Sequence, residues 1–208
     1  MNTPAAPYHH GNLRAALVEA GLELARQDGP DAVVVREASR RAGVSHNAAY
    51  RHFSDRAQLL KEVCERCMSE LARRIEAQVA AVPPGDDAVL TARLRLRATG
   101  AAYVEFALAE PGWFRTAFAV PRELTHFGPG EGGGDSGLSP FELLNANLDA
   151  LTAVGGLPAD HRPGAEIVAW SGVHGLATLL IDGPLRGMPV HERRRSLERL
   201  LDTVEKGL

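Results

Sequence analysis

The chain has 208 residues, of which 45% are hydrophobic and 24% are charged, as in ordinary globular proteins of one large or two smaller domains. No apolar run approaches the roughly 18 residues that a membrane span needs, and residues 1–10 lack the basic start and apolar run of a secretory signal. We therefore expect a cytoplasmic protein. The formal net charge of -3 does not by itself indicate a nucleic-acid partner, so the local distribution of charge matters more.

Apolar residues recur every three or four positions over most of the chain, and the alternation typical of strands is absent. Gly and Pro interrupt this pattern at residues 28–31, 82–85 and 110–112. We therefore predict an all-α fold of about nine helices, at residues 11–28, 35–42, 46–53, 56–81, 87–109, 113–119, 139–154, 163–182 and 189–206.

Residues 121–138 contain two prolines and a glycine-rich run without apolar periodicity. Long segments of this kind are often functional or disordered. We predict a mobile loop there, which is either a lid over a binding site or a tolerated insertion.

Residues 35–53 combine a short helix, a glycine turn and a second short helix, which is the helix-turn-helix arrangement. Gly43 supplies the positive φ that a tight reversal requires, and Ser45 is a suitable cap for the second helix. Such a unit places its second helix in the major groove of DNA, with its first residues against the base edges.

The segment from Arg36 to Lys61 is locally basic, with six basic and two acidic residues. A basic segment in an acidic chain is typical of a phosphate-binding face. A solvated helical surface is the alternative interpretation of the same run.

The runs Arg36–Ser45, Tyr50–Phe53 and Asp55–Leu60 together resemble the TetR family of repressors. The resemblance implies that the three N-terminal helices bind DNA and that the C-terminal helices dimerise and hold an inducer. Residues 9–11, residues 110–112 and the set Trp170, His174 and Gly175 are similar to one C-terminal subfamily with a Trp–His–Gly signature.

The resemblance orients the recognition helix and thereby gives a set of DNA-binding residues. The first polar pair faces outward, where an Asn can pair with adenine and a His can donate to guanine or phosphate, and a small side chain can meet a thymine methyl group. Helix capping alone is the alternative role for this first turn. Val34 departs from the family, which has Ser or Thr there. The expected DNA-binding residues are Ser45, His46, Asn47, Ala48, Tyr50, His52 and Arg56.

We predict a DNA-binding domain at 1–55, a connecting helix at 56–81 and a ligand-binding and dimerisation domain at 83–208. Ligand pockets are mostly apolar with a few polar groups, although aromatic residues at helical spacing also form ordinary cores. The candidate ligand-binding residues are Tyr103, Phe106, Trp113, Phe114, Phe118, Phe141, Trp170 and His174.

The last two predicted helices carry enough apolar residues to pair across a two-fold axis as a four-helix bundle. These residues are Ile167, Val168, Leu176, Leu179, Leu180, Leu197, Leu200, Leu201 and Val204. The expected function is a homodimeric repressor of a palindromic double-stranded operator, released when a small-molecule inducer tilts the helix at 56–81.

The chain lacks the phosphate-binding, nucleophile-elbow, zinc-protease and dinucleotide motifs, so we expect no enzyme, no cofactor and no metal. Two alternatives to the inducible repressor remain. One is a redox-responsive regulator that uses Cys64 and Cys67, although cysteines inside a helix are usually small hydrophobic residues and a disulfide there would distort the helix. The other is a helical small-molecule-binding module without enzymatic activity.

Overall fold

The computed structural model describes residues 13–120 and 132–207. These residues form nine α-helices and one 3₁₀ turn, without strands, so the predicted all-α fold is confirmed. The elements are α1 (Leu13–Asp28), η1 (Pro30–Ala32), α2 (Val35–Arg41), α3 (His46–Tyr50), α4 (Arg56–Ala80), α5 (Ala88–Ala109), α6 (Pro111–Ala117), α7 (Pro140–Ala153), α8 (Ala165–Ile181) and α9 (Val190–Gly207).

The described helices differ from their predicted bounds by no more than three residues, and the differences at α3 and α6 have a clear physical reason. α3 ends at Tyr50 instead of residue 53, because the chain turns after Arg51 and carries Phe53 into the core. α6 begins at Pro111 instead of residue 113, since proline suits the first position of a helix, where no amide partner is needed. The part of the predicted loop at 121–131 lies outside the described residues, as do residues 9–11.

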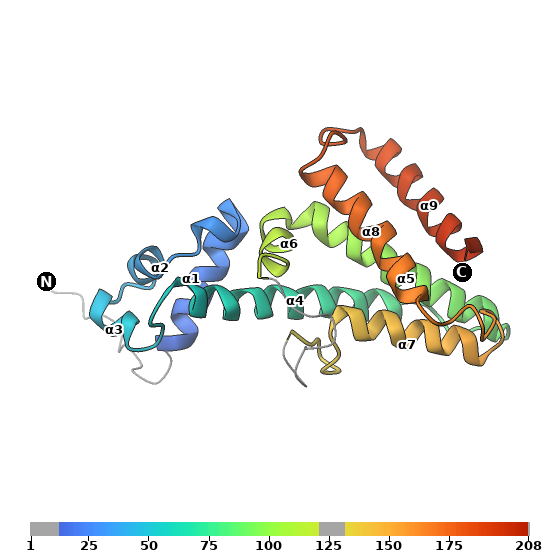
Figure 1. Ribbon diagram of the computed structural model, residues 1–208, viewed down its shortest axis with the longest axis horizontal. Coiled ribbons are helices and arrows are strands. Elements are labelled where there is room, and N and C mark those ends of the chain that lie inside the picture. The colour runs from blue at the N-terminus through green and yellow to red at the C-terminus, as the bar shows by residue number, and fades with distance from the viewer. Residues whose placement is uncertain (1–12, 121–131, 208) are drawn as a thin grey trace, which may run out of the picture.

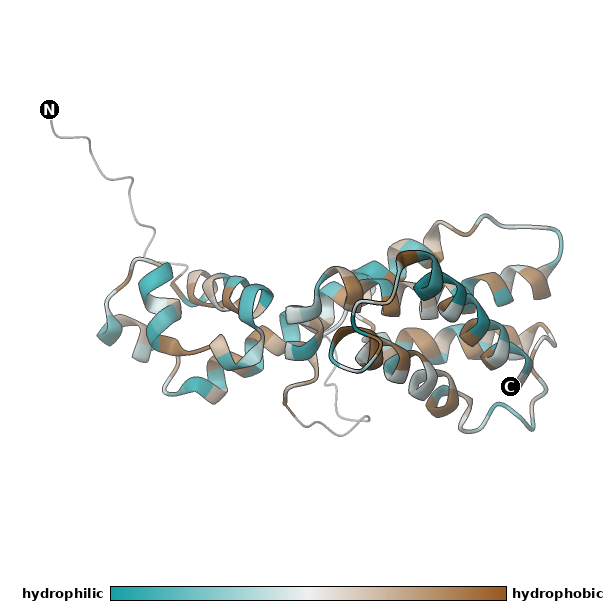
Figure 2. Ribbon diagram, turned by 90° about the horizontal axis from the view of Figure 1, so that it is seen from above, coloured by the Kyte–Doolittle hydropathy of each residue, from teal (hydrophilic) through white to brown (hydrophobic). Residues whose placement is uncertain are grey.

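The molecule is elongated, with a small lobe of α1–α3 at one end and a larger lobe of α5–α9 at the other (Figure 1). α4 starts in the small lobe and runs on into the large one. Seen from above, the two lobes meet at a narrow waist (Figure 2). Among the described helices, none is long and apolar enough to cross a membrane.

The small lobe has its own hydrophobic core, which includes Leu17, Val33, Ala49 and Phe53. The first half of α4 completes this core with residues such as Leu59. α4 begins there because the Asp55 side chain accepts a hydrogen bond from the Gln58 amide at 3.0 Å, which caps the helix. The second half of α4 packs into the core of the large lobe, so one helix belongs to both lobes.

α5 is the central helix of the large lobe and contacts α4, α6, α7, α8 and α9. α9 returns beside α8 (Figure 1), and both bury part of their apolar faces within the chain. Leu180, Leu197 and Leu201 are buried in this core, and Leu200 lies against Gly172. These leucines serve the fold of one protomer. Of the residues predicted for dimerisation, the exposed ones are Ile167, Val168 and Leu179.

Candidate nucleic-acid interface and ligand cavity

The helix-turn-helix forms as the sequence predicts. Gly43 has a φ of +68° in the turn between α2 and α3. The Ser45 hydroxyl accepts a hydrogen bond from the Ala48 amide at 3.2 Å and caps α3. Val34 occupies the N-cap of α2 without a side-chain capping bond, as expected from its aliphatic side chain. Because Ala49 faces the core, the opposite side of α3 faces solvent.

The predicted DNA-contacting residues of α3 gather on that solvent side. Ser45, His46 and Asn47 are exposed and Ala48 is half-buried. Tyr50 is 47% exposed, and the His46 ring meets it edge-on with 5.0 Å between the ring centroids. An exposed tyrosine beside exposed polar residues is suited to contact with the sugar–phosphate backbone that borders a DNA groove.

Arg56 and His52 take part in intramolecular contacts. The Arg56 guanidinium donates to the carbonyl oxygens of Val33 at 3.1 Å and Pro30 at 2.8 Å. It therefore holds η1 against the start of α4. The His52 carbonyl accepts a hydrogen bond from Arg14, and the His52 side chain is half-buried.

The other cations of this surface differ in how strongly they are neutralised. Arg40 forms a bidentate pair with Glu37, and Arg41 donates to Gln27. Arg36 and Arg51 are exposed and form no ion pair with the part of the chain that the structure describes. Unneutralised arginines are the groups best suited to phosphate contacts.

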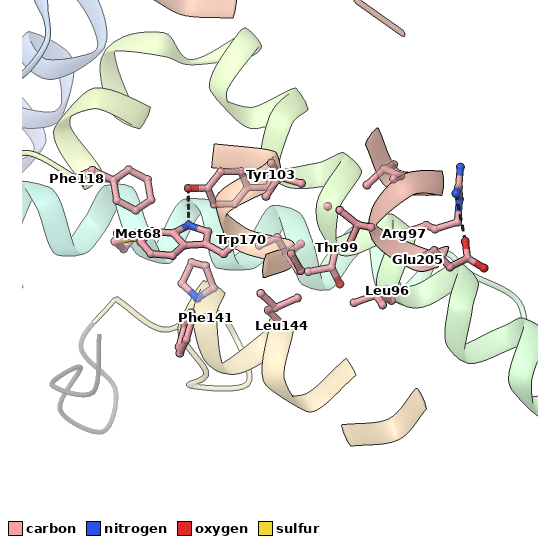
Figure 3. Close-up of a pocket in the computed structure, with 18 of the residues that line it drawn as sticks. Met68, Leu96, Arg97, Thr99, Tyr103, Phe118, Phe141, Leu144, Trp170 and Glu205 are labelled. Carbon is pink, nitrogen blue, oxygen red and sulfur yellow. Dashed lines mark hydrogen bonds and ion pairs between the residues drawn. The ribbon is translucent and has the colours of Figure 1, made fainter. Parts of the chain in front are cut away.

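A cavity of about 250 Å³ lies in the large lobe (Figure 3). Of the predicted ligand residues, Tyr103, Phe118, Phe141 and Trp170 line it. The structure places four others outside its wall: Phe106, Trp113, Phe114 and His174. Phe106 and Phe114 are buried in the surrounding core.

One end of the cavity is aromatic, and its polar atoms bind one another. The Trp170 Nε1–H donates to the Tyr103 hydroxyl at 3.1 Å, and that hydroxyl is 2.8 Å from His174 Nδ1. Burial lowers the pKa of His174 and raises the pKa of Tyr103, so both side chains are neutral near pH 7. This end therefore offers an apolar surface without charge.

The other end carries an ion pair that the sequence reasoning missed. Arg97 on α5 pairs with Glu198, Asp202 and Glu205 of α9, at 2.7, 2.5 and 3.3 Å. Partial burial disfavours the charged form of Arg97 and by itself would lower its pKa. The interactions with these carboxylates have the larger effect, so the pKa of Arg97 is raised. Glu198, Asp202 and Glu205 are spaced four and then three residues apart, which places them on one helix face. This spacing is the feature of the sequence that could have indicated the cluster of carboxylates.

α6 connects the cavity to the small lobe. Its last residue, Ala117, and the C-cap residue Phe118 line the cavity. Its first residues lie on α1, where a Cβ atom at Gly112 would overlap the carbonyl oxygens of Ala25 and Arg26. Trp113, which the sequence analysis predicts to be a ligand-binding residue, instead donates its Nε1–H to the Leu22 carbonyl on α1 at 2.8 Å.

An ion pair strengthens the same junction. Arg26 donates to both carboxylate oxygens of Glu110, at 2.8 and 2.6 Å, and its guanidinium carbon lies 5.1 Å from the centroid of the Trp113 ring. Glu110 is 7% exposed, so its carboxylate is largely withdrawn from water and needs this partner. No local sequence pattern indicates this pair, whose members are 84 residues apart.

The two cysteines lie inside the small-lobe core. Cys64 donates its thiol hydrogen to the Thr116 carbonyl at 2.9 Å, and burial raises the pKa of the Cys67 thiol. Reactive cysteines are instead exposed and have a lowered pKa. Within the described residues, no group of three or more His, Cys, Asp or Glu side chains is placed to hold a metal.

A helix-turn-helix lobe joined to a helical lobe with an apolar cavity defines a one-component transcriptional regulator. Residues 17–63 match the family model described as bacterial regulatory proteins, tetR family. Residues 96–204 match the model described as tetracyclin repressor-like, C-terminal domain. The chain belongs to the TetR family.

Solved structures share this fold. A protein of unknown function from Rhodococcus sp. RHA1 is 30% identical, with a TM-score of 0.67 over 98% of this chain and 99% of that chain. TetR from Acinetobacter baumannii AYE is 19% identical, with a TM-score of 0.62 over 93% of this chain and 94% of that chain. A TetR variant from the same organism, solved in complex with minocycline, is 18% identical, with a TM-score of 0.60 over the same shares of the two chains.

The curated relatives match a shorter segment. An HTH-type transcriptional repressor of Mycobacterium tuberculosis is 28% identical over 75 residues, which is 36% of this chain. The match spans 40% of that protein's length, so it supports the regulatory class and leaves the regulated genes and ligands open to proposal.

The intramolecular bonds of Arg56 generate a stability prediction. Arg56→Gln removes the donors to Val33 and Pro30 and should lower the free energy of unfolding by about 1 kcal/mol. Arg51→Gln, at an exposed arginine three residues after Ala48, is the matched control and should change stability by less than about 0.5 kcal/mol. Urea denaturation followed by circular dichroism measures both. Equal stability of the two variants would contradict the bracing role.

Proposed function

We propose that this TetR-family regulator is a repressor that acts in the cytoplasm as a homodimer on a palindromic operator and is released by a small-molecule inducer. The observation that carries the proposal is the position of α6, which touches the cavity at one end and α1 of the DNA-binding lobe at the other. Occupation of the cavity therefore has a short physical route to the recognition helix.

For DNA, we propose that the exposed turn of α3 enters the major groove. Asn47 and His46 read base edges, Ala48 approaches a thymine methyl group, and Ser45 supports the helix N-terminus. Tyr50 binds the phosphate backbone beside the groove. We add Arg36 and Arg51 to the backbone contacts, keep His52 among them, and assign Arg56 mainly to bracing, since its guanidinium group is engaged within the lobe.

For the ligand, we propose that Tyr103, Phe118, Phe141 and Trp170 form the aromatic part of the site. His174 supports it by holding the Tyr103 hydroxyl. Phe106 and Phe114 support the wall from behind. Trp113 transmits the state of the cavity to α1 rather than touching the ligand.

For the dimer, we propose the outer face of α8 as the main contact. Ile167, Val168 and Leu179 are exposed there, and a Cβ atom at Gly175 would meet nothing within 4 Å. A small residue between apolar ones permits close approach of a second helix across a two-fold axis. We keep the Trp–His–Gly subfamily as a proposal, in which close approach of the second protomer would be the role of Gly175.

The domain limits of 1–55 and 83–208 also remain a proposal. α4 contributes to both cores, so the division runs along this helix rather than at one peptide bond. We propose that residues 132–138, the described part of the predicted 121–138 loop, which precedes α7, lie beside the ligand entrance.

The DNA proposal predicts two kinds of loss. Selection from random duplexes should enrich one palindromic motif. Asn47→Ala should cost about 1–3 kcal/mol at one base position and relax specificity there. Arg51→Gln should instead weaken binding to all sequences and reduce the salt dependence. Titrations at several salt concentrations distinguish the two, and failure to enrich any motif would refute the operator.

The dimer proposal predicts that bulk at Gly175 separates the protomers. Gly175→Arg leaves the protomer intact because the space there is open, but it blocks a neighbouring helix. Sedimentation should show monomers, and operator binding should weaken at least about tenfold, since two half-sites are no longer read together. Gly207→Arg, also in open space but at the end of α9, is the control. A dimeric Gly175→Arg protein would exclude this face.

The proposed connection through α6 predicts that a variant can bind the inducer and yet release operator DNA less than the wild type does. Trp113→Phe keeps an aromatic ring but loses the donor to Leu22. With a compound that screening finds to release wild-type protein from its operator, this variant should still bind the compound yet release DNA less. Trp170→Ala should lose compound binding itself. Wild-type responses from both variants would place the inducer elsewhere.

A further inference from the structure

The cavity has two chemically different ends, which Figure 3 shows at opposite sides of the close-up. Phe118, Phe141 and the hydrogen-bonded Trp170 and Tyr103 form one end. Thr99, Leu96 and Leu144 lie between the ends, and the Arg97–Glu205 ion pair closes the other. A ligand that fills this elongated cavity must therefore be apolar along most of its length and polar at one tip.

Glu205 is the least firmly paired carboxylate of the network. Arg97 is 2.7 Å from Glu198 and 2.5 Å from Asp202, but 3.3 Å from Glu205. Arg93 approaches Glu205 only to 3.5 Å. Glu205 also lines the cavity, where its side chain is 21% exposed, whereas the wall does not include Glu198 or Asp202.

These differences favour a cation over an anion at this end. A ligand ammonium can bind Glu205 while Arg97 keeps its two short bonds to the other carboxylates. A ligand carboxylate would instead become the fourth anion around Arg97. Arg93 and Arg97 face three carboxylates, so this group of five already has one net negative charge.

The aromatic end complements this selection. Its hydroxyl, indole and imidazole groups are hydrogen-bonded to one another, and His174 is neutral. Burying a ligand charge there without a partner would be costly, whereas an aromatic or aliphatic group would pack against the rings. The ends thus fix the orientation of an amphipathic ligand.

We propose that the inducer class is an elongated amphipathic amine, with its apolar tail among Phe118, Phe141 and Trp170 and its ammonium group at Glu205. This inference rests on the proposed function of the cavity as an inducer site. It adds the charge of the ligand and the residue that recognises it.

The test uses three probes of the same carbon number: phenylbutylamine, phenylbutanol and phenylbutanoate, each with the phenyl group at the chain end. Calorimetric titration of the full chain at pH 7 should give the amine at least about tenfold tighter binding than the alcohol, and the carboxylate the weakest. Leu144→Trp, which fills the middle of the cavity, should abolish binding of all three. Circular dichroism confirms that each variant is folded.

Two variants isolate the charge at the cavity wall. Glu205→Gln should abolish the preference for the amine over the alcohol. Glu198→Gln removes a carboxylate from the same arginine, but one outside the wall, and should keep the amine preference. Glu198→Gln is therefore the matched control, because it weakens the ion pairs of Arg97 without removing a carboxylate from the cavity wall.

An amine preference that survives in Glu205→Gln, or equal binding of amine and carboxylate, overturns the inference. Binding of no probe overturns it as well. The proposed function fails by a separate measurement, because operator selection with the unliganded dimer does not depend on any probe. A protein that selects an operator and is released by phenylbutanol as readily as by phenylbutylamine keeps the function and loses the inference.

Discussion

The docking of α6 on α1 is the contact on which the relation between the two lobes depends. It requires a residue without a side chain at position 112, because the backbone of Ala25 and Arg26 occupies the space of a Cβ atom. Once the backbones are this close, Trp113 reaches the Leu22 carbonyl and Arg26 reaches the carboxylate of Glu110. These contacts are mutually dependent, so α6 cannot shift alone without leaving a largely buried carboxylate unpaired.

The second connection between the lobes is α4, and it constrains the first. Thr116 of α6 is fully buried, and its hydroxyl donates to the Gly112 carbonyl while its own carbonyl accepts from Cys64 on α4. α6 is thus fixed to α1 on one side and to α4 on another. Since α4 also supplies Leu59 to one core and Leu71 to the other, motion of α6 is transmitted to a helix that both lobes share. Helices packed at interior density move as units rather than deform continuously.

Sequence periodicity and turn residues were sufficient for the helices and for the helix-turn-helix. Gly43, Ser45 and Asp55 act locally, within a few residues of the bonds they determine, so their roles could be predicted. The ion pairs at Glu110 and Glu205 join residues that are 84 and 108 positions apart. The spacing along α9 places Glu205 on one helix face with two other carboxylates, but no local pattern indicates which arginine pairs with either glutamate. For the same reason, the sequence could not distinguish the braced Arg56 from the exposed Arg51, or assign Trp113 to α1 rather than to the cavity.

The proposed release also has to be energetically sufficient. A hundredfold change in operator affinity requires that the ligand favour one lobe arrangement by about 2.7 kcal/mol. Contacts with α5, α7 and α8 give affinity but no shift unless they differ between the two arrangements. α6 contributes Ala117 to the wall, and its C-cap residue Phe118 lies there too; fully burying one large apolar side chain that is otherwise exposed is worth about 1.5–3 kcal/mol. A ligand that buries Phe118 fully in one arrangement and leaves it exposed in the other would therefore supply a difference of the required size. Phe118 follows the helix whose first residues are fixed to α1, so such a difference would act on the junction between the lobes.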